Sequence, residues 1–272
     1  MTTESYVRFF SFSQAPFFKE IEDNDLWLPP SKEEIVEEIC EAVNDHGQIM
    51  LVGEPGAGKT CVLRAVRHRL PQAGFRLTYC HNATLGRRDF YRQLCQALGL
   101  TPAATAAAVF YAVSAHVEYL GRERIHPVFL LDEAHLLHQD TLDHLHILLN
   151  YEWDSRALLS LILVGLSDLQ DRLELRKNRS LFSRIERRLS IGPMILDDTA
   201  QYVQMRLGRA GVDRDIFTAD ALSLLHEAAG SSLREIDRIA TATLRETARR
   251  KKKLVERDVM AKIVGDLQPT SD

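Results

Sequence analysis

The chain has 272 residues, of which 45% are hydrophobic and 26% are charged. This length accommodates one large α/β domain and a smaller helical one, and the composition excludes a fibrous or largely disordered protein. The formal net charge is −4, so the chain as a whole does not attract nucleic acid. Any contact with DNA must therefore come from a local basic cluster.

The sequence carries few features that indicate a cellular location. None of the four cysteines pairs with another at C-x-x-C spacing, which excludes the common zinc and redox motifs. The N-terminus lacks a basic segment followed by an apolar one, so it is no signal peptide. The most apolar runs, residues 158–166 and 103–115, are shorter than the roughly 20 residues that cross a membrane. We expect a cytoplasmic protein without a membrane partner.

Residues 1–46 form the first predicted region, an N-terminal linker followed by a helix. The linker is rich in aromatic and turn residues. Ile35 and Ile39 recur at helical spacing, and Ser31 with Glu34 fits a capping box at the start of that helix.

Residues 47–195 alternate predicted strands and helices. Short apolar runs predict strands at 48–52, 75–80, 128–131 and 159–164. One-sided apolar spacing predicts helices at 62–70, 88–98, 104–120 and 141–149. Buried strands that alternate with amphipathic helices indicate an α/β fold, a parallel sheet with helices on both faces.

Residues 196–272 show no strand signal and predict a small all-helical domain. Asp198 or Thr199 is expected to cap its first helix. Three further helices are expected at 219–229, 233–247 and 256–264.

Residues 53–60 carry the full G-x-x-x-x-G-K-[ST] pattern of a P-loop. Its glycines let the backbone wrap around phosphate, and the helix that follows adds a favourable dipole. Lys59 is expected to reach the β- and γ-phosphates of ATP, and the Thr60 hydroxyl to bind Mg²⁺. The predicted nucleotide-binding residues are Gly53, Glu54, Pro55, Gly56, Ala57, Gly58, Lys59, Thr60 and Cys61.

An acidic pair, Asp132 and Glu133, follows the apolar run at 128–131. Asp132 is expected to hold Mg²⁺, and Glu133 to orient and polarise the attacking water. An apolar run that ends in two acids is a weak signal by itself. Behind an intact P-loop it predicts an ATPase that hydrolyses ATP.

With both motifs placed, the chain resembles the AAA+ ATPases. Within them it is similar to the ExeA-like group, which is related to the transposition ATPases TniB, TnsC and Mu B. The matching segments are FSQAPF at 12–17, the P-loop, LLDEAH at 130–135, LLNYEWDS at 148–155, LILVG at 161–165 and GSSLREIDRI at 230–239. The resemblance implies a P-loop domain, a helical lid that closes over ATP, and a homo-oligomer in the form of a ring or helical filament.

The resemblance also implies roles for two residues around the γ-phosphate. Ser167 corresponds to the sensor-1 position, although this chain lacks the Gly-Gln-Pro-like turn that the family often has there. The alternative is a plain turn serine. Arg234 corresponds to the sensor-2 arginine of the lid, which contacts the γ-phosphate. Its alternative is a solvated helix arginine.

Arg184 lies in a segment that resembles the one carrying the arginine finger of the family, which acts on the ATP of a neighbouring subunit. A guanidinium suits this role because it offers a rigid fork of donors to the developing phosphate charge. Arg187 and Arg188 are close competitors.

Two basic clusters are candidate contacts to double-stranded DNA. In DNA-encircling relatives the loop after the 75–80 strand faces the channel, so Arg87 and Arg88 are expected to bind phosphate there. Lys251 and Lys252 lie in a basic run at 249–253. The alternative for that run is a solvated helix end that complements the helix dipole.

The leading functional hypothesis is a transposition regulator whose ATP-bound form assembles on DNA and recruits or activates a transposase. Secretion-type ExeA proteins extend into a membrane segment and a peptidoglycan-binding domain, and this sequence shows neither. One alternative is an ATPase that energises secretion-complex assembly at the cell envelope. A second is a signalling or defence ATPase whose nucleotide state carries the output.

Overall fold

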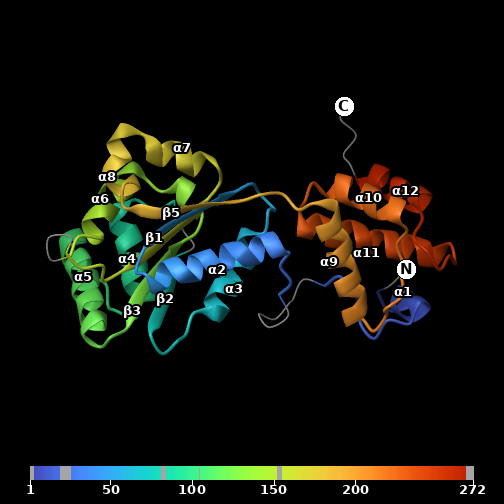
Figure 1. The fold of residues 1–272 in the computed structure, drawn as a ribbon, viewed down its shortest axis with the longest axis horizontal. Helices are drawn as coiled ribbons and strands as arrows, with labels where there is room; N and C mark the ends of the chain where they lie inside the picture. The colour runs from blue at the N-terminus through green and yellow to red at the C-terminus, as the bar shows by residue number, and fades with distance from the viewer. Residues whose placement is uncertain (1–2, 19–25, 81–83, 104, 152–154, 268–272) are drawn as a thin grey trace. The chain divides into compact units, whose positions relative to one another are not determined.

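A computed structural model gives the fold and describes residues 3–18, 26–80, 84–103, 105–151 and 155–267 (Figure 1). Contacts divide the chain into two compact units. The sheet unit comprises Pro30–Glu54 and Lys59–Ile191, and the helical unit comprises Met1–Pro29, Pro55–Gly58 and Gly192–Asp272.

The sheet unit contains five strands in the order β2-β3-β4-β1-β5, and every neighbouring pair is parallel. The strands are β1 (Gln48–Gly53), β2 (Phe75–Cys80), β3 (His126–Leu131), β4 (Ser160–Gly165) and β5 (Ile185–Ile191). All residues of the three central strands are buried, as expected for strands covered on both faces. The carboxyl ends of β1, β3 and β4 therefore meet at one edge of the sheet.

Helices cover both faces of this sheet, which confirms the predicted α/β fold. On one face α2 (Pro30–Asn44) and α3 (Lys59–Arg69) pack on β1. On the other face the side chains of Met50, Phe129 and Leu163 share a buried core with five helices. These helices are α4 (Arg87–Ala97), α5 (Ala106–Arg122), α6 (Gln139–Leu148), α7 (Asp168–Glu174) and α8 (Arg179–Phe182).

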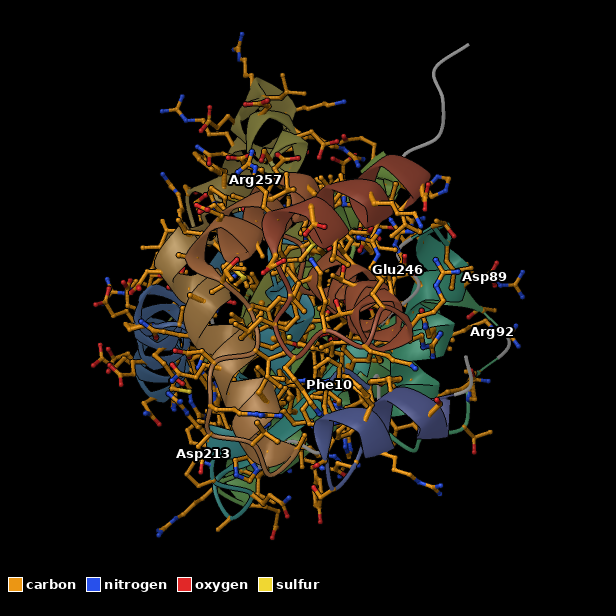
Figure 2. All side chains as sticks on the ribbon, turned by 90° about the vertical axis from the view of Figure 1, so that its right-hand side faces the viewer. Phe10, Asp89, Arg92, Asp213, Glu246 and Arg257 are labelled. Atoms are coloured by element: carbon orange, nitrogen blue, oxygen red, sulfur yellow. The ribbon has the colours of Figure 1, made fainter. Side chains whose placement is uncertain are left out.

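The described part of the helical unit consists of helices joined by loops. Its helices are α1 (Thr3–Phe10), α9 (Leu196–Arg209), α10 (Ala219–Ala229), α11 (Leu233–Arg249) and α12 (Arg257–Leu267). Figure 2 shows the buried side chain of Phe10 among these helices, whereas Asp213 and Arg257 are exposed. The helical C-terminal region agrees with the prediction.

The predicted first region, residues 1–46, is shared between the two units. Helix α2 packs on β1 and β5, whereas α1 packs on α11. Phe10 and Phe17 are buried in the core of the helical unit. The aromatic residues of the linker therefore belong to a hydrophobic core that is separate from the core of the sheet.

Two helix starts differ from the prediction. Helix α9 begins at Leu196, and the carboxylate of Asp198 folds back to accept the backbone N–H of Ile195 at 3.1 Å. The cap predicted at Asp198 or Thr199 is therefore wrong. Helix α2 begins at Pro30, where a fixed φ suits the first helical turn, so Ser31 lies inside the helix.

None of the described helices is long and apolar enough to cross a membrane.

Candidate active site

The P-loop connects the end of β1 to the start of α3. Gly56 and Gly58 have φ angles of +83° and +97°, in a region that residues with a Cβ atom rarely adopt. The motif needs glycine at these two positions for that reason. The first N–H groups of α3 have no partners within the helix, so this turn favours an anion. The local backbone thus fits the phosphates that the sequence motif predicts.

Lys59 is the first residue of α3 and is almost fully buried. Its Nζ atom donates hydrogen bonds to the carbonyl oxygens of Gly53 at 2.6 Å and Glu54 at 3.1 Å. These two bonds hold the ammonium group over the loop rather than in solvent. Because an ammonium group has three protons, Lys59 can donate one further hydrogen bond, for example to a phosphate oxygen.

Asp132 follows β3, and both of its carboxylate oxygens are held. Oδ2 accepts a hydrogen bond from the hydroxyl of Tyr79 at 2.9 Å, and Oδ1 accepts one from the backbone N–H of Glu133 at 2.9 Å. Tyr79 lies on β2 and pairs in register with Leu130 of β3, which places its ring beside the end of that strand. Burial and the bond to Asp132 raise the pKa of Tyr79 to about 12, so it is a neutral donor.

Thr60 and Asp132 line the same hollow, which has a volume of about 220 Å³. The sequence separates these residues widely, but the parallel order of β1 and β3 brings them together. A hydroxyl and a carboxylate are oxygen ligands of the kind that Mg²⁺ prefers. The two residues present therefore fit the predicted metal.

Glu133 has a left-handed backbone, with φ 53° and ψ 36°. Non-glycine residues in this conformation are uncommon and cluster at functional sites. Its carboxylate is exposed, and its Oε2 lies 3.4 Å from Nδ1 of His135. The strained turn thus keeps an accessible carboxylate directly after Asp132, and its role as the base that activates water stays a prediction.

Ser167 lies directly after β4 and before α7. Its hydroxyl donates a hydrogen bond of 2.7 Å to Oε1 of Glu54 in the P-loop. The two residues meet because β4 pairs with β1, with Gly165 opposite Val52. The contact places Ser167 beside the P-loop, and its role as a sensor stays a prediction.

The turn after Glu133 is held against β4 by residues that the sequence analysis missed. The backbone N–H of Leu166 donates to Nδ1 of His135 at 3.4 Å, and Arg172 on α7 donates to the His135 carbonyl at 2.7 Å. A Cβ atom at Gly165 would lie 3.2 Å from the backbone nitrogen of His135, which is a tight contact, so glycine suits this close approach. The role of Tyr79 was also missed, because its bond to Asp132 depends on the register between β2 and β3.

Arg184 immediately precedes β5, and its Nη1 atom donates to the carbonyl of Ser180 at 2.9 Å. The next residue, Ile185, pairs with Gln48 at the start of β1, whereas the P-loop follows the end of β1. Arg184 therefore lies at the opposite edge of the sheet from the P-loop of its own chain.

The two competitors of Arg184 lie within β5. Arg187 pairs with Ile49 and Arg188 with Met50. The guanidinium of Arg188 stacks 3.8 Å from the centre of the Phe182 ring and also donates to the Phe182 carbonyl. These contacts favour a structural role for Arg188.

Arg234 is the second residue of α11 in the helical unit, and it is exposed. The helix start is fixed by Ser232, whose hydroxyl accepts the backbone N–H of Glu235 at 3.4 Å.

Of the first DNA candidates, Arg87 opens α4 and is half-buried, whereas the adjacent Arg88 is exposed. Residues 81–83 of the preceding loop lie outside the described residues.

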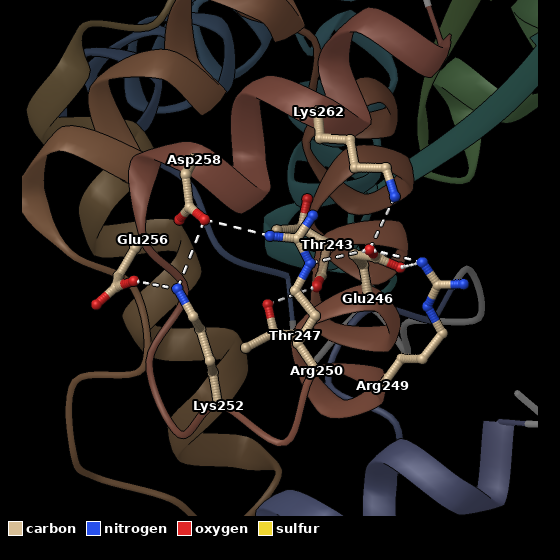
Figure 3. A network of polar contacts seen from close by, with 9 residues as sticks. All are labelled: Thr243, Glu246, Thr247, Arg249, Arg250, Lys252, Glu256, Asp258 and Lys262. Atoms are coloured by element: carbon tan, nitrogen blue, oxygen red, sulfur yellow. Dashed lines mark hydrogen bonds and ion pairs between the residues drawn. The ribbon is translucent and has the colours of Figure 1, made fainter.

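The basic run at 249–253 is largely neutralised by local ion pairs (Figure 3). Arg249, Arg250 and Lys262 surround the carboxylate of Glu246 at 2.7, 3.1 and 3.0 Å. Lys252 pairs with Glu256 at 2.6 Å. These pairs favour the interpretation of the run as a helix end.

A family model described as an AAA domain matches residues 29–173, more than half of the chain. The chain belongs to the AAA domain family. General secretion pathway protein A of Aeromonas hydrophila is 31% identical over 258 residues, which are 93% of this chain and 47% of that relative. The chain thus spans about half the length of that protein. The match supports the ExeA-like part of the resemblance, and the relation to transposition ATPases stays a prediction.

Solved structures share the fold of this AAA domain. Drosophila ORC bound to DNA superposes with a TM-score of 0.70 at 19% identity, over 97% of this chain and 66% of that one. Cdc6p from Pyrobaculum aerophilum superposes with a TM-score of 0.68 at 16% identity, over 93% of this chain and 73% of that one. At these identities the likeness concerns the fold, which is the AAA+ arrangement expected from the sequence.

Proposed function

We propose that this chain binds and hydrolyses Mg-ATP at the carboxyl edge of its sheet. The observation that carries the proposal is the convergence of Thr60 and Asp132 on one hollow, next to the buried ammonium of Lys59. Two separate segments contribute these groups: the start of α3 supplies Lys59 and Thr60, and the end of β3 supplies Asp132. Mg²⁺, when bound with ATP, supplies charge that neutralises the phosphates.

The residues around the proposed ATP site have different roles. Lys59 binds the β- and γ-phosphates, and Cys61 continues the helix start that cradles them. Glu133 accepts a proton from the attacking water or polarises it. Ser167 is placed to report the γ-phosphate to the P-loop through Glu54.

Two arginines, Arg184 and Arg234, complete the proposed ATP site. Arg184 lies at the far edge of its own sheet, so we assign it to the ATP of a neighbouring subunit. Arg234 is assigned to the γ-phosphate of its own subunit, where its charge couples lid position to nucleotide state. ATP then joins subunits of a homo-oligomer, a ring or a helical filament.

Replacing Glu133 by glutamine tests the chemical role. The Glu133→Gln variant is expected to lose ATP turnover by about a hundredfold or more while it still binds ATP, because the amide cannot accept a proton. The matched control is Glu123→Gln, an exposed glutamate at the end of α5. Turnover at the wild-type rate in Glu133→Gln contradicts the assignment.

For the assembly, our leading proposal is a transposition regulator whose ATP-bound form gathers on double-stranded DNA and engages a transposase. Support comes from the exposed Arg88 after β2 and from the shared fold with ORC, which is solved bound to DNA. The ion pair with Glu256 makes Lys252 the weaker candidate, whereas the exposed Lys251 stays a candidate contact.

Sedimentation with a non-hydrolysable ATP analogue and duplex DNA tests this assembly. We expect complexes at low salt that weaken steeply at higher salt, because phosphate contacts release counterions. Arg88→Gln should weaken them, and Arg92→Gln, one turn further along α4, serves as the control. Absence of any complex at low salt contradicts the DNA proposal and leaves the ATPase proposal intact.

A second candidate is an ATPase that energises secretion-complex assembly with a membrane-anchored partner. The 31% identity to General secretion pathway protein A favours it. Pull-down from detergent-solubilised envelopes, with the Glu133→Gln variant held in its ATP state, separates the two candidates. Capture of an envelope protein together with absence of DNA complexes favours secretion.

A further inference from the structure

Three helices on the α4 face of the sheet enclose a second hollow, which has a volume of about 290 Å³. It is lined by Arg87 and Tyr91 of α4, Ala106 and Phe110 of α5, and His144 of α6. None of its lining residues belongs to the P-loop or to the acidic pair after β3. The site described above therefore does not account for this hollow.

Positive charge converges on this hollow. Arg87 is half-buried, and no carboxylate among the described residues forms an ion pair with its guanidinium. Helix α5 begins at Ala106, where the Thr105 side chain accepts only the N–H of Ala108. The N–H groups of Ala106 and Ala107, which both line the hollow, therefore lack partners within the helix. A guanidinium and a helix start together favour an anion.

Within the part of the chain that the structure describes, two buried polar atoms of the lining residues have no hydrogen-bond partner. They are the hydroxyl of Tyr91, a residue that is only 2% exposed, and Nδ1 of His144. Buried polar groups are nearly always paired, so an unpaired one indicates a missing partner. Burial raises the pKa of Tyr91, which keeps the phenol protonated and able to donate.

Aromatic rings form an apolar wall. The centre of the Phe110 ring lies 5.5 Å from that of Tyr91 and 5.7 Å from that of His144, and both pairs meet edge to face. An apolar wall beside a few convergent polar groups is the usual composition of a small-molecule pocket. The volume suits a ligand about the size of one aromatic ring with an acidic group.

We propose that this hollow binds a small organic anion, a carboxylate or phosphate monoester carried on a flat apolar body. The oxyanion accepts from Arg87 and from the first N–H groups of α5. The apolar body lies against the Phe110 ring. An acceptor atom on the ligand receives a hydrogen bond from the Tyr91 hydroxyl. The site is separate from ATP turnover, so it stands or falls without the proposed function.

Isothermal titration of the full chain, saturated with Mg-ADP to fill the P-loop, tests the proposal. The probes are phenyl phosphate and benzoate, with inorganic phosphate and neutral phenol as comparisons. We expect at least one aromatic anion to bind with a Kd of about 1 mM or tighter. Inorganic phosphate should bind at least about tenfold more weakly, and phenol should show no binding, because one lacks the apolar body and the other the charge.

Arg87→Gln should weaken binding of the aromatic anion at least about tenfold, and Tyr91→Phe about threefold or more. Arg92→Gln is the matched control, because this arginine of α4 does not line the hollow. Amide chemical shifts of Ala106 and Ala107 in the wild-type chain provide a readout that needs no variant. Unchanged affinity in Arg87→Gln, unmoved amide shifts, or absence of binding by both aromatic anions overturns the proposal.

Discussion

The hydroxyl of Ser167 donates a hydrogen bond of 2.7 Å to Oε1 of Glu54. This bond joins the end of β4 to the loop that follows β1, across the pairing of Gly165 with Val52. Through it, the residue that we propose as the γ-phosphate sensor contacts a side chain of the P-loop. Movement of either residue is therefore transmitted to the other.

Loss of the bond between Ser167 and Glu54 should impair detection of the γ-phosphate without impairing nucleotide binding by the P-loop. We expect Ser167→Ala to lower ATP turnover by about tenfold while the Kd for ADP changes less than about threefold. Ser223→Ala on α10, outside the sheet unit, is the control. An equal loss of ADP affinity and turnover would instead assign Ser167 to the stability of the loop.

Tyr79 should position Asp132 for the metal. In Tyr79→Phe one carboxylate oxygen loses its hydrogen bond, so the bond from the Glu133 N–H alone orients the carboxylate. We expect the Mg²⁺ concentration for half-maximal turnover to rise by about threefold to tenfold, with kcat at saturating Mg²⁺ much less affected. Tyr119→Phe on α5 is the control, because that tyrosine is exposed and remote from the site. The prediction fails if the Mg²⁺ dependence is that of the wild type.

Glu246 should stabilise the helical unit in a pH-dependent manner. Hydrogen bonds from Arg249 and Lys262 lower the pKa of its carboxyl to about 2, from an ordinary 4.5. Since the folded pKa is the lower one, the stabilisation is fully present above pH 4.5 and is lost as pH falls through about 2.

Glu246→Gln is therefore expected to lower the Tm by about 2–4 °C at neutral pH. The difference from the wild type should shrink as the pH is lowered. Glu227→Gln on α10 is the control. Calorimetry at several pH values checks this, and a difference that stays constant down to pH 2 would contradict the assignment.

The sequence predicted the nucleotide motifs well because their chemistry is local. Gly56 and Gly58 need positive φ, and the buried strand before Asp132 reads as an unbroken apolar run. The order of strand and helix was enough to place these segments at one edge of a parallel sheet. No long-range contact had to be known.

Features that depend on tertiary contacts were not predicted. Strand β5 has one neighbour and carries charged residues at 186–188, so it lacks the apolar signature of the central strands. The bond from Tyr79 to Asp132 depends on the register between β2 and β3. The start of α9 depends on the Asp198 carboxylate, which accepts the backbone N–H of Ile195. The sequence pattern is equally compatible with Asp198 as the cap itself.

We propose that ATP is hydrolysed between subunits, with Glu133 from one chain and Arg184 from the next. Mixing two inactive variants tests it most directly. In Arg184→Ala the P-loop and Glu133 are intact, and in Glu133→Gln the arginine is intact. Random mixing in equal amounts creates complete sites at about a quarter of the interfaces. We expect turnover to reappear at about a quarter of the wild-type rate. Turnover no higher than the mean of the two variants would show that Glu133 and Arg184 do not act across a subunit interface.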